Sequence, residues 1–291
     1  FLLGYVQQSS VRFGQPDSYP RQSVFSLFAQ DEWRARPNLT LNAGLRYDVW
    51  LPFTEKYGRL ANLDLAPGFT AAAVVTPGSA GPWAGRVPDG LIRTDRNNIS
   101  PRIGIAWRPG QNRRTIVRLG YSIFYDASVF GRIPQRLTYQ PPFATSATFN
   151  TSPAARLTLA APFRGPETQT ILNSYAVNPD YRAPYAQTWN FHVQQDVRGY
   201  VFELGYLGTK GTALVIQRIP NRAPPGSPAD SELRRPIPYA TGFTYDSPEG
   251  NSIFHAGQLR VVRRMRRGVS WSAVYTFSKS IDNASSIGGA G

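Results

Sequence analysis

Cysteine is absent from this chain of 291 residues, and histidine occurs only twice, at His192 and His255. Disulfide bonds and thiolate metal sites are therefore excluded, and few ligands remain for a transition-metal centre. Long hydrophobic runs are also missing: the longest, residues 71–75, is far below the ~18 apolar residues of a membrane-spanning helix. We therefore expect no metal, no cofactor and no helical membrane span.

Negative charge is scarce: the formal net charge is +14, and arginine far outnumbers lysine. Such a balance fits nucleic acid or the anionic headgroups of a membrane. A nucleic-acid surface would interleave basic residues with exposed stacking aromatics. The arginines cluster instead at short turns beside apolar stretches, so we interpret them as reaching towards lipid phosphates and expect no nucleic-acid partner. These turn residues are Arg34, Arg36, Arg113, Arg114, Arg198, Arg263, Arg264, Arg266 and Arg267.

The chain is rich in alternation of apolar and polar residues. The stretch NLTLNAGLRYDVW (38–50) alternates almost throughout, and residues 115–125, 185–197 and 269–277 repeat the pattern. A period of two is typical of a β-strand with one apolar and one polar face. Many aromatics and no clean helical pattern favour an all-β class. Four residues break the alternation: Phe28 and Phe124 fall on the polar parity, and Asp31 and Gln187 on the apolar one.

Short and long connections alternate between these strands. Turn residues at 36–38, 109–114, 198–199 and 266–268 predict four hairpins. Long loops are expected at about 52–98, 127–184 and 215–251, which is more irregular chain than a compact soluble domain usually holds. A transmembrane β-barrel has short turns on one side and long extracellular loops on the other. The expected strands, eight in four hairpins and a ninth within residues 1–14, run about 10–14 residues, enough to cross a bilayer when tilted.

Large aromatics on the apolar parity lie near the two ends of the strands, and small aliphatic residues fill the middle. This is the arrangement of two aromatic girdles around a lipid-facing band. In a soluble sandwich the largest aromatics would gather at mid-strand instead. The girdle near the short turns comprises Trp33, Trp107, Tyr200 and Trp271, and the girdle near the long loops comprises Tyr47, Tyr125, Tyr185 and Phe277.

Several stretches resemble barrel hairpins of TonB-dependent outer-membrane receptors. LFAQDEWRARPNLTLNAGLRYD (27–48) resembles the superfamily, and the ending YTFSKSIDNA (275–284) is similar to the Oar-like subgroup. The resemblance covers the hairpins, about half of the chain, and not the long loops. It implies a gated antiparallel channel of 22 strands with an N-terminal plug domain, energised by the TonB complex. The substrates it implies are siderophores, cobalamin, oligosaccharides or peptides, and its location is the bacterial outer membrane.

The chain departs from that pattern. No plug and no TonB-contacting segment precede the first expected strand, and FLLGYVQQSSVRFG (1–14) does not read as a signal peptide. We therefore interpret residues 1–291 as a partial barrel of about nine strands, with the plug domain absent. The plug, the TonB complex and an unknown transported ligand are the expected partners, together with outer-membrane lipid and lipopolysaccharide.

No residues in the sequence form a catalytic motif. His192 and His255 lie in different hairpins without a nucleophile motif, and neighbouring Asp31 and Glu32 would point to opposite faces of a strand. We therefore do not expect an enzyme. The candidates for function are polar-face residues towards the lumen or plug, and aromatic or basic loop residues that could capture an acidic or aromatic ligand. The lumen-facing candidates are Arg46, Asp48, Arg102, Arg118, His192, Gln194 and Glu203; the loop candidates are Trp83, Arg86, Phe130, Arg132, Tyr139, Arg182, Arg234 and Tyr239.

Two other interpretations stay open at this point. A soluble all-β binding module would fold without detergent. A passive porin or a barrel enzyme would lack a plug and would not depend on TonB.

Overall fold

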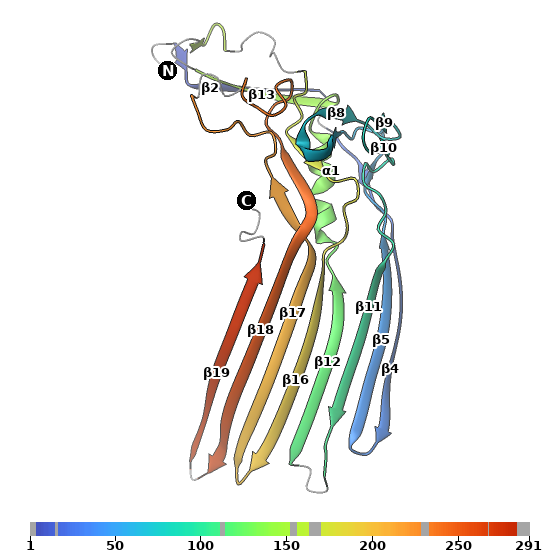
Figure 1. Cartoon of the computed structure of the whole chain (residues 1–291), viewed down its shortest axis with the longest axis vertical. Helices are drawn as coiled ribbons and strands as arrows, with labels where there is room; N and C mark the ends of the chain where they lie inside the picture. The colour runs from blue at the N-terminus through green and yellow to red at the C-terminus, as the bar shows by residue number, and fades with distance from the viewer. Residues whose placement is uncertain are drawn as a thin grey trace.

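A computed structural model describes residues 4–14, 17–110, 114–151, 156–162, 170–227, 233–266 and 268–283. Eight long antiparallel strands lie side by side in one sheet, and the long connections gather at one end of it (Figure 1). The predicted four hairpins are therefore confirmed. The strands are β4 (Val24–Arg36), β5 (Leu39–Trp50), β11 (Asn98–Trp107), β12 (Thr115–Tyr125), β16 (Tyr185–Val197), β17 (Tyr200–Arg218), β18 (Thr244–Arg266) and β19 (Val269–Asp282).

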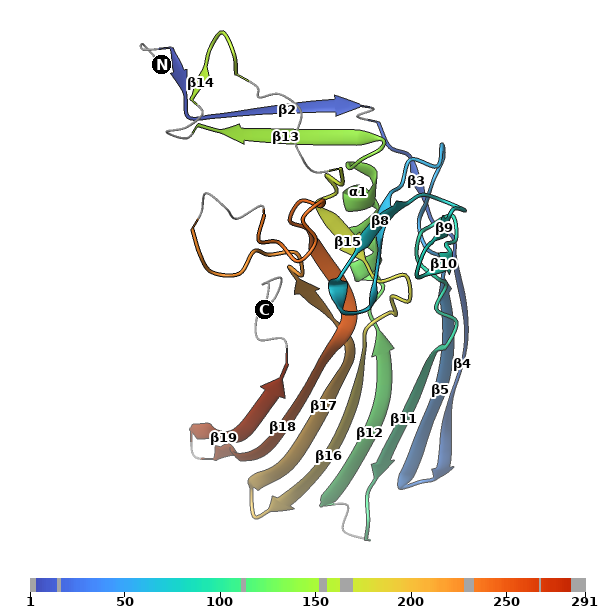
Figure 2. The ribbon, with the colours of Figure 1, turned by 45° about the horizontal axis from the view of Figure 1, so that its top comes forward.

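The strand order across the sheet is β4-β5-β11-β12-β16-β17-β18-β19, so every long strand pairs with its neighbour in sequence. The turn from β16 to β17 has two residues, Arg198 (φ 50°) and Gly199 (φ 90°). Positive φ at both central positions defines a type I′ turn, whose twist matches the twist of the flanking strands. Figure 2 shows the short turns together at one end of the sheet, which we call the turn end. The opposite end is the loop end.

The expected ninth barrel strand is placed differently. Residues 1–14 do contain a strand, β2 (Gln8–Gly14), but β2 pairs with β13 (Ala144–Asn150) in a separate two-stranded sheet away from the eight long strands (Figure 2). The ninth strand of the main sheet is β15 (Tyr175–Val177), which runs parallel to the loop end of β18. Alternation predicts that a strand exists, but it carries no information on the partner.

The third long loop is shorter than expected. β17 continues to Arg218 and β18 begins at Thr244, so residues 215–218 and 244–251 of the expected loop 215–251 are strand. The pairing shifts register between Thr212 and Leu214 and again between Leu214 and Ile216. Each bulge reverses the phase of the alternation, which hides the strand from a search for a period of two.

The long connections contain short elements of their own. We call their described residues at the loop end, within 52–97, 126–184 and 219–243, the loop cap. Strands of two to four residues are too short to show periodicity, which is why these segments look irregular in sequence. The elements are β7 (Asn62–Leu65) paired with β8 (Ala72–Val75), β9 (Ala80–Gly81) with β10 (Gly85–Arg86), and the helical turns η1 (Pro67–Phe69), η2 (Ser128–Gly131) and α1 (Ile133–Thr138). Two further strands of the connections pair with the segment before β4: β14 (Leu157–Thr158) with β1 (Tyr5–Val6), and β6 (Thr54–Glu55) with β3 (Pro20–Arg21).

The hydrophobic cores lie in the loop cap and not along the long strands. One cluster packs Leu60, Leu91, Leu137 and Tyr181 together, and a second includes Leu63, Ile237 and Phe243. Along the long strands, by contrast, large apolar side chains such as Leu204 and Phe277 are exposed. The described part of the sheet therefore has no second layer against either face, unlike a soluble sandwich. None of the helices in the described residues has the length and apolar character needed to cross a membrane.

Candidate functional site

The register of the sheet sorts its side chains into two faces. Directly paired residues in an antiparallel ladder point to the same side. Following the pairs from strand to strand places all seven lumen-facing candidates on one side, which we call the polar face. The other side, the apolar face, carries most of the aliphatic and aromatic residues. The polar-face candidates are Arg46, Asp48, Arg102, Arg118, His192, Gln194 and Glu203.

Asp48 is the most buried of these residues, with 4% of its surface exposed, and it is fully paired. Ser26 donates to one carboxylate oxygen at 2.5 Å, and the Arg46 guanidinium lies 2.8 Å from the other. Arg46 also donates to Ser26. The triad joins β4 to β5 near the loop end, and its satisfied hydrogen bonds make it a structural element of the wall.

Glu203 and Arg260 form a second pair on the polar face, at 3.2 Å between β17 and β18. Arg118 and His192 are directly opposite each other in the ladder between β12 and β16. The next partner in that row is Gly205, where a Cβ would lie 2.8 Å from Nδ1 of His192. Glycine therefore gives the imidazole room to lie across β17.

The two aromatic exceptions to the alternation are neighbours of arginines on the polar face. The Arg102 guanidinium lies over the Phe124 ring, 5.0 Å from its centroid. Phe28 pairs with Arg46 in the ladder and lines a shallow cavity of about 210 Å³ together with Gln30, Arg46 and Arg102. An arginine over an aromatic face is a stabilising contact. In the sequence, Phe28 and Phe124 only interrupt the alternation of apolar and polar residues. The alternation did not predict that they lie next to arginines.

The girdle candidates lie on the apolar face at both ends of the strands. At the loop end the Tyr125 and Tyr185 rings are 5.2 Å apart, and Tyr47 donates its hydroxyl to the Arg96 carbonyl. At the turn end Tyr200 and Trp271 have their ring centroids 6.2 Å apart. These contacts are compatible with the two girdles, which stay a prediction.

Trp33 and Phe277 show how the girdles relate to the tilt of the strands. Trp33 was assigned to the girdle near the short turns and Phe277 to the girdle near the long loops. Successive ladder pairs nevertheless join these two residues in one row across all eight strands. Strands in such barrels are tilted by ~40°, so a row over seven strand spacings of ~4.8 Å climbs by about 20 Å. One row can therefore join the two borders of an apolar band.

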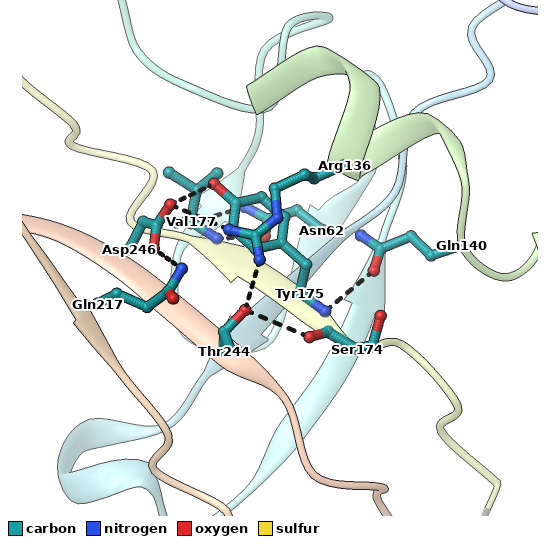
Figure 3. Close-up of polar contacts among 9 residues, drawn as sticks. All are labelled: Asn62, Arg136, Gln140, Ser174, Tyr175, Val177, Gln217, Thr244 and Asp246. Carbon is teal, nitrogen blue, oxygen red and sulfur yellow. Dashed lines mark hydrogen bonds and ion pairs between the residues drawn. The ribbon is translucent and has the colours of Figure 1, made fainter. Parts of the chain in front are cut away.

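A partly buried polar network ties the loop cap to the sheet (Figure 3). Asp246 of β18 accepts hydrogen bonds from the Tyr175 hydroxyl at 2.9 Å and from Gln217 at 2.8 Å. The Arg136 guanidinium lies over the Tyr175 ring and 3.6 Å from the Asp246 carboxylate. Burial, together with the nearby carboxylate, raises the pKa of the Tyr175 hydroxyl, so it stays protonated and donates.

A single side chain, Asn62, continues this network into the first long connection. Its amide donates to the Val177 carbonyl at 2.8 Å, and its oxygen accepts from the Val177 amide at 2.9 Å. Gln140 bridges in the same way between Ala61 and Tyr175. Three segments distant in sequence are thus held together by side chains that a sequence search has no reason to select.

The loop candidates separate into exposed and structural residues. Phe130 is 5% exposed and packs edge-on against Tyr181 in the first core. Tyr239 bonds both the amide and the carbonyl of Ala72 through its hydroxyl. Tyr139 is half-buried beneath Arg12, and Arg234 donates to two loop carbonyls. The exposed candidates are Trp83, Arg86, Arg132, Arg182 and also Tyr239, which is 40% exposed although its hydroxyl is bonded.

Glu55 should make the outer loops sensitive to acid. Its burial raises the pKa of the carboxyl, but hydrogen bonds from the amides of Arg59, Tyr19 and Tyr57 outweigh burial and lower it below the ordinary value. A depressed pKa contributes stability above the unfolded-state pKa, and this contribution is lost as pH falls through the folded-state pKa. We expect proteolysis near residues 17–23 to accelerate as pH falls below about 4.5. In Glu55→Gln this acid-dependent step should disappear; a step of unchanged size would contradict the assignment.

Within the described residues, no three histidine or acidic side chains lie close enough together to hold a metal ion. The two histidines lie on opposite faces of the sheet, His192 on the polar face and His255 on the apolar one. The described residues thus form one sheet with a polar face and an apolar face, and a folded loop cap at one end of it.

An antiparallel wall of long two-faced strands, with short turns at one end, defines a membrane β-barrel. Comparison with family models agrees: the outer membrane beta barrel domain matches residues 1–291, and the chain belongs to that family. The expected barrel class and the bacterial outer membrane location are thereby confirmed. A comparison with curated proteins finds no significant match.

Solved structures give the same fold. The outer membrane transporter YddB from Escherichia coli is similar at a TM-score of 0.51 and 15% identity, over 90% of this chain and 25% of YddB. Two weaker likenesses are the siderophore receptor PirA from Pseudomonas aeruginosa (TM-score 0.44, 11% identity, 89% and 32% of the two chains) and the FrpB iron transporter from Neisseria meningitidis (0.45, 11%, 91% and 27%). The chain therefore spans a quarter to a third of the length of these proteins.

Proposed function

We propose that this chain is barrel wall from a TonB-dependent outer-membrane transporter of the Oar-like subgroup. It would serve the energised uptake of a ligand too large for porins, such as a siderophore, an oligosaccharide or a peptide. The observation that carries the proposal is the single wall with an arginine-rich polar face, short turns at one end and a folded cap at the other. The fold shared with the transporter YddB supports the same class.

In this proposal the polar face meets a plug domain. Asp48 and Glu203 already have arginine partners within the wall. Arg102 and Arg118 are exposed, and within the described residues neither lies in an ion pair. A plug with acidic residues at the matching height would satisfy both guanidinium groups. Gln194 and His192 would add hydrogen-bonding groups to the same contact.

The loop cap is the proposed site of ligand capture. Arg86, Arg132 and Arg182 are exposed there, and so is Trp83. Such residues favour an acidic or aromatic ligand. Deletion of residues 127–184 would remove α1 and β15, and with them part of the first core, so point variants are the better test. Arg132→Ala and Arg182→Ala should weaken ligand binding and leave the cap folded.

Dependence of uptake on TonB tests the proposal. Cells that carry the full-length gene would be given an ⁵⁵Fe-labelled siderophore, a labelled maltodextrin and a labelled peptide, with and without the tonB gene. We expect one of these probes to accumulate at least about 10-fold less without tonB, because uptake of a large ligand against a closed channel needs energy. Equal accumulation of every probe in both strains, with steady conductance in planar bilayers, would establish the passive porin instead.

A further inference from the structure

Lysine is rare in this chain, and its few copies are unevenly placed. The sequence has three lysines, and two of them, Lys210 and Lys279, lie on the apolar face of adjacent hairpins. Lys279 pairs directly with His255 of β18, and Lys210 pairs with Ile253, two residues before His255 on the same strand. Three basic or ionisable side chains thus share one corner of a face that is mostly aliphatic and aromatic.

Neighbouring aromatics hold this corner in place. The Tyr206 hydroxyl hydrogen-bonds Nδ1 of His255 at 2.8 Å, and the two rings are stacked. Trp189 lies across Gly208, where no side chain stands in its way, with its ring 6.1 Å from the imidazole. Within the described residues, neither lysine lies within ion-pair distance of a carboxylate. Two positive charges on a lipid-facing wall therefore lack a partner from that part of the chain.

The height of the lysines on the wall identifies what they meet. Tyr200, Arg263 and Trp271 mark the turn-end border, with the Arg263 guanidinium over the Tyr200 ring. Lys279 is eight residues from Trp271 along β19, and Lys210 is ten residues from Tyr200 along β17. At ~3.3 Å per residue and a tilt of ~40°, these separations correspond to about 20–25 Å along the membrane normal. This is the height of the apolar band of a membrane barrel, so both ammonium groups lie at the headgroup level of the loop-end leaflet.

We propose that Lys210 and Lys279, with His255 between them, bind the phosphate groups of a lipid in the outer leaflet. The two strands that carry the lysines are separated by β18, so their backbones are about 10 Å apart, within reach of two flexible side chains or of two phosphates on one headgroup. Trp189 and Tyr206 would lie against the acyl–headgroup boundary, where amphipathic rings are favoured. The site depends on the lipid contact of the apolar face and not on transport.

Retention of lipid A by the full-length purified protein tests this site. In native mass spectrometry, wild-type protein from nanodiscs should retain bisphosphorylated lipid A in preference to dephosphorylated lipid A. In K210A/K279A this preference should fall on the order of 10-fold, given the attraction of each lysine to an anionic surface. K210R/K279R should keep it, because the charges remain. Lys56→Ala is the matched control, since Lys56 lies between Tyr19 and Tyr57 in the loops and should change nothing.

Two results would overturn the proposal. One is wild-type protein that does not distinguish the two forms of lipid A, a comparison that needs no variant to fold. The other is K210A/K279A that is folded by its heat-modifiable migration and retains bisphosphorylated lipid A as well as wild type does.

Discussion

Leu204→Arg should lower the stability of the assembled barrel by about 2–4 kcal/mol, the cost of arginine on a lipid-facing position near the bilayer midplane. Leu204 is 58% exposed and lies on the apolar face, paired with Val193 and Leu259. It is four residues from Tyr200, which places it about 10 Å above the turn-end border at ~3.3 Å per residue and ~40° of tilt. The guanidinium cannot reach either headgroup region from there without distorting the bilayer.

Leu207→Arg is the matched control on the same strand. Leu207 is 37% exposed, but it pairs with Asn190 and Ala256 on the polar face. The same substitution there places the charge among polar groups, and we expect a loss below about 1 kcal/mol. Urea titration of the full-length protein refolded into lipid vesicles measures both variants. Equal losses for Leu204→Arg and Leu207→Arg would show that the apolar face does not meet lipid.

The long strands could be predicted from the sequence because their signal is local. One face of each strand is apolar and the other polar, so the period of two survives in any context that keeps the two faces apart. The turn at Arg198 and Gly199 could also be predicted from the sequence, because a two-residue turn needs positive φ values that glycine adopts easily. The same local logic explains why the seven polar-face candidates were found together on one side of the sheet.

The loop cap could not be predicted because its contacts join residues far apart in the chain. Asn62 and Val177 are separated by 115 positions, and Ala72 and Tyr239 by 167. Nothing in the sequence near either partner marks it for the other. Phe130 was selected as a loop aromatic open to a ligand, but the structure places it in a core. Tyr239 bonds Ala72 through its hydroxyl and is still 40% exposed. Residue type in a long loop indicates chemistry, and only packing tells whether that chemistry is available.

Asp246→Ala should lower the free energy of local unfolding of the loop cap by about 3 kcal/mol. The reason is that removal of one partner leaves other buried polar groups unpaired. The Asp246 side chain is 14% exposed and is the common acceptor for Tyr175 and Gln217. Tyr175 is 2% exposed, so its hydroxyl has no ready access to water as a substitute. The backbone pairing of β15 with β18, which also runs through Asp246, loses its side-chain support at the same point.

Hydrogen exchange of the full-length protein locates this effect. Exchange in residues 171–184 and 233–247 should accelerate about 100-fold, since each ~1.4 kcal/mol is a factor of ten. Exchange in β12 and β16, below the cap, should be unchanged. Asp180→Ala is the control: Asp180 also pairs with an arginine, Arg93 at 2.7 Å, but its side chain is 68% exposed, and such pairs contribute less than about 1 kcal/mol.

Asp246→Asn distinguishes the effect of the negative charge of Asp246 from the effect of its hydrogen-bond acceptors. Asparagine keeps one oxygen that can accept from Tyr175, but its amide group faces the Gln217 donor and it loses the attraction to Arg136. We expect hydrogen exchange in the loop cap of Asp246→Asn to be faster than in Asp180→Ala and slower than in Asp246→Ala. Protection in Asp246→Ala equal to that of wild type would mean that the apolar cores alone hold the cap. The cap would then be free to rearrange around a ligand without breaking its link to the sheet.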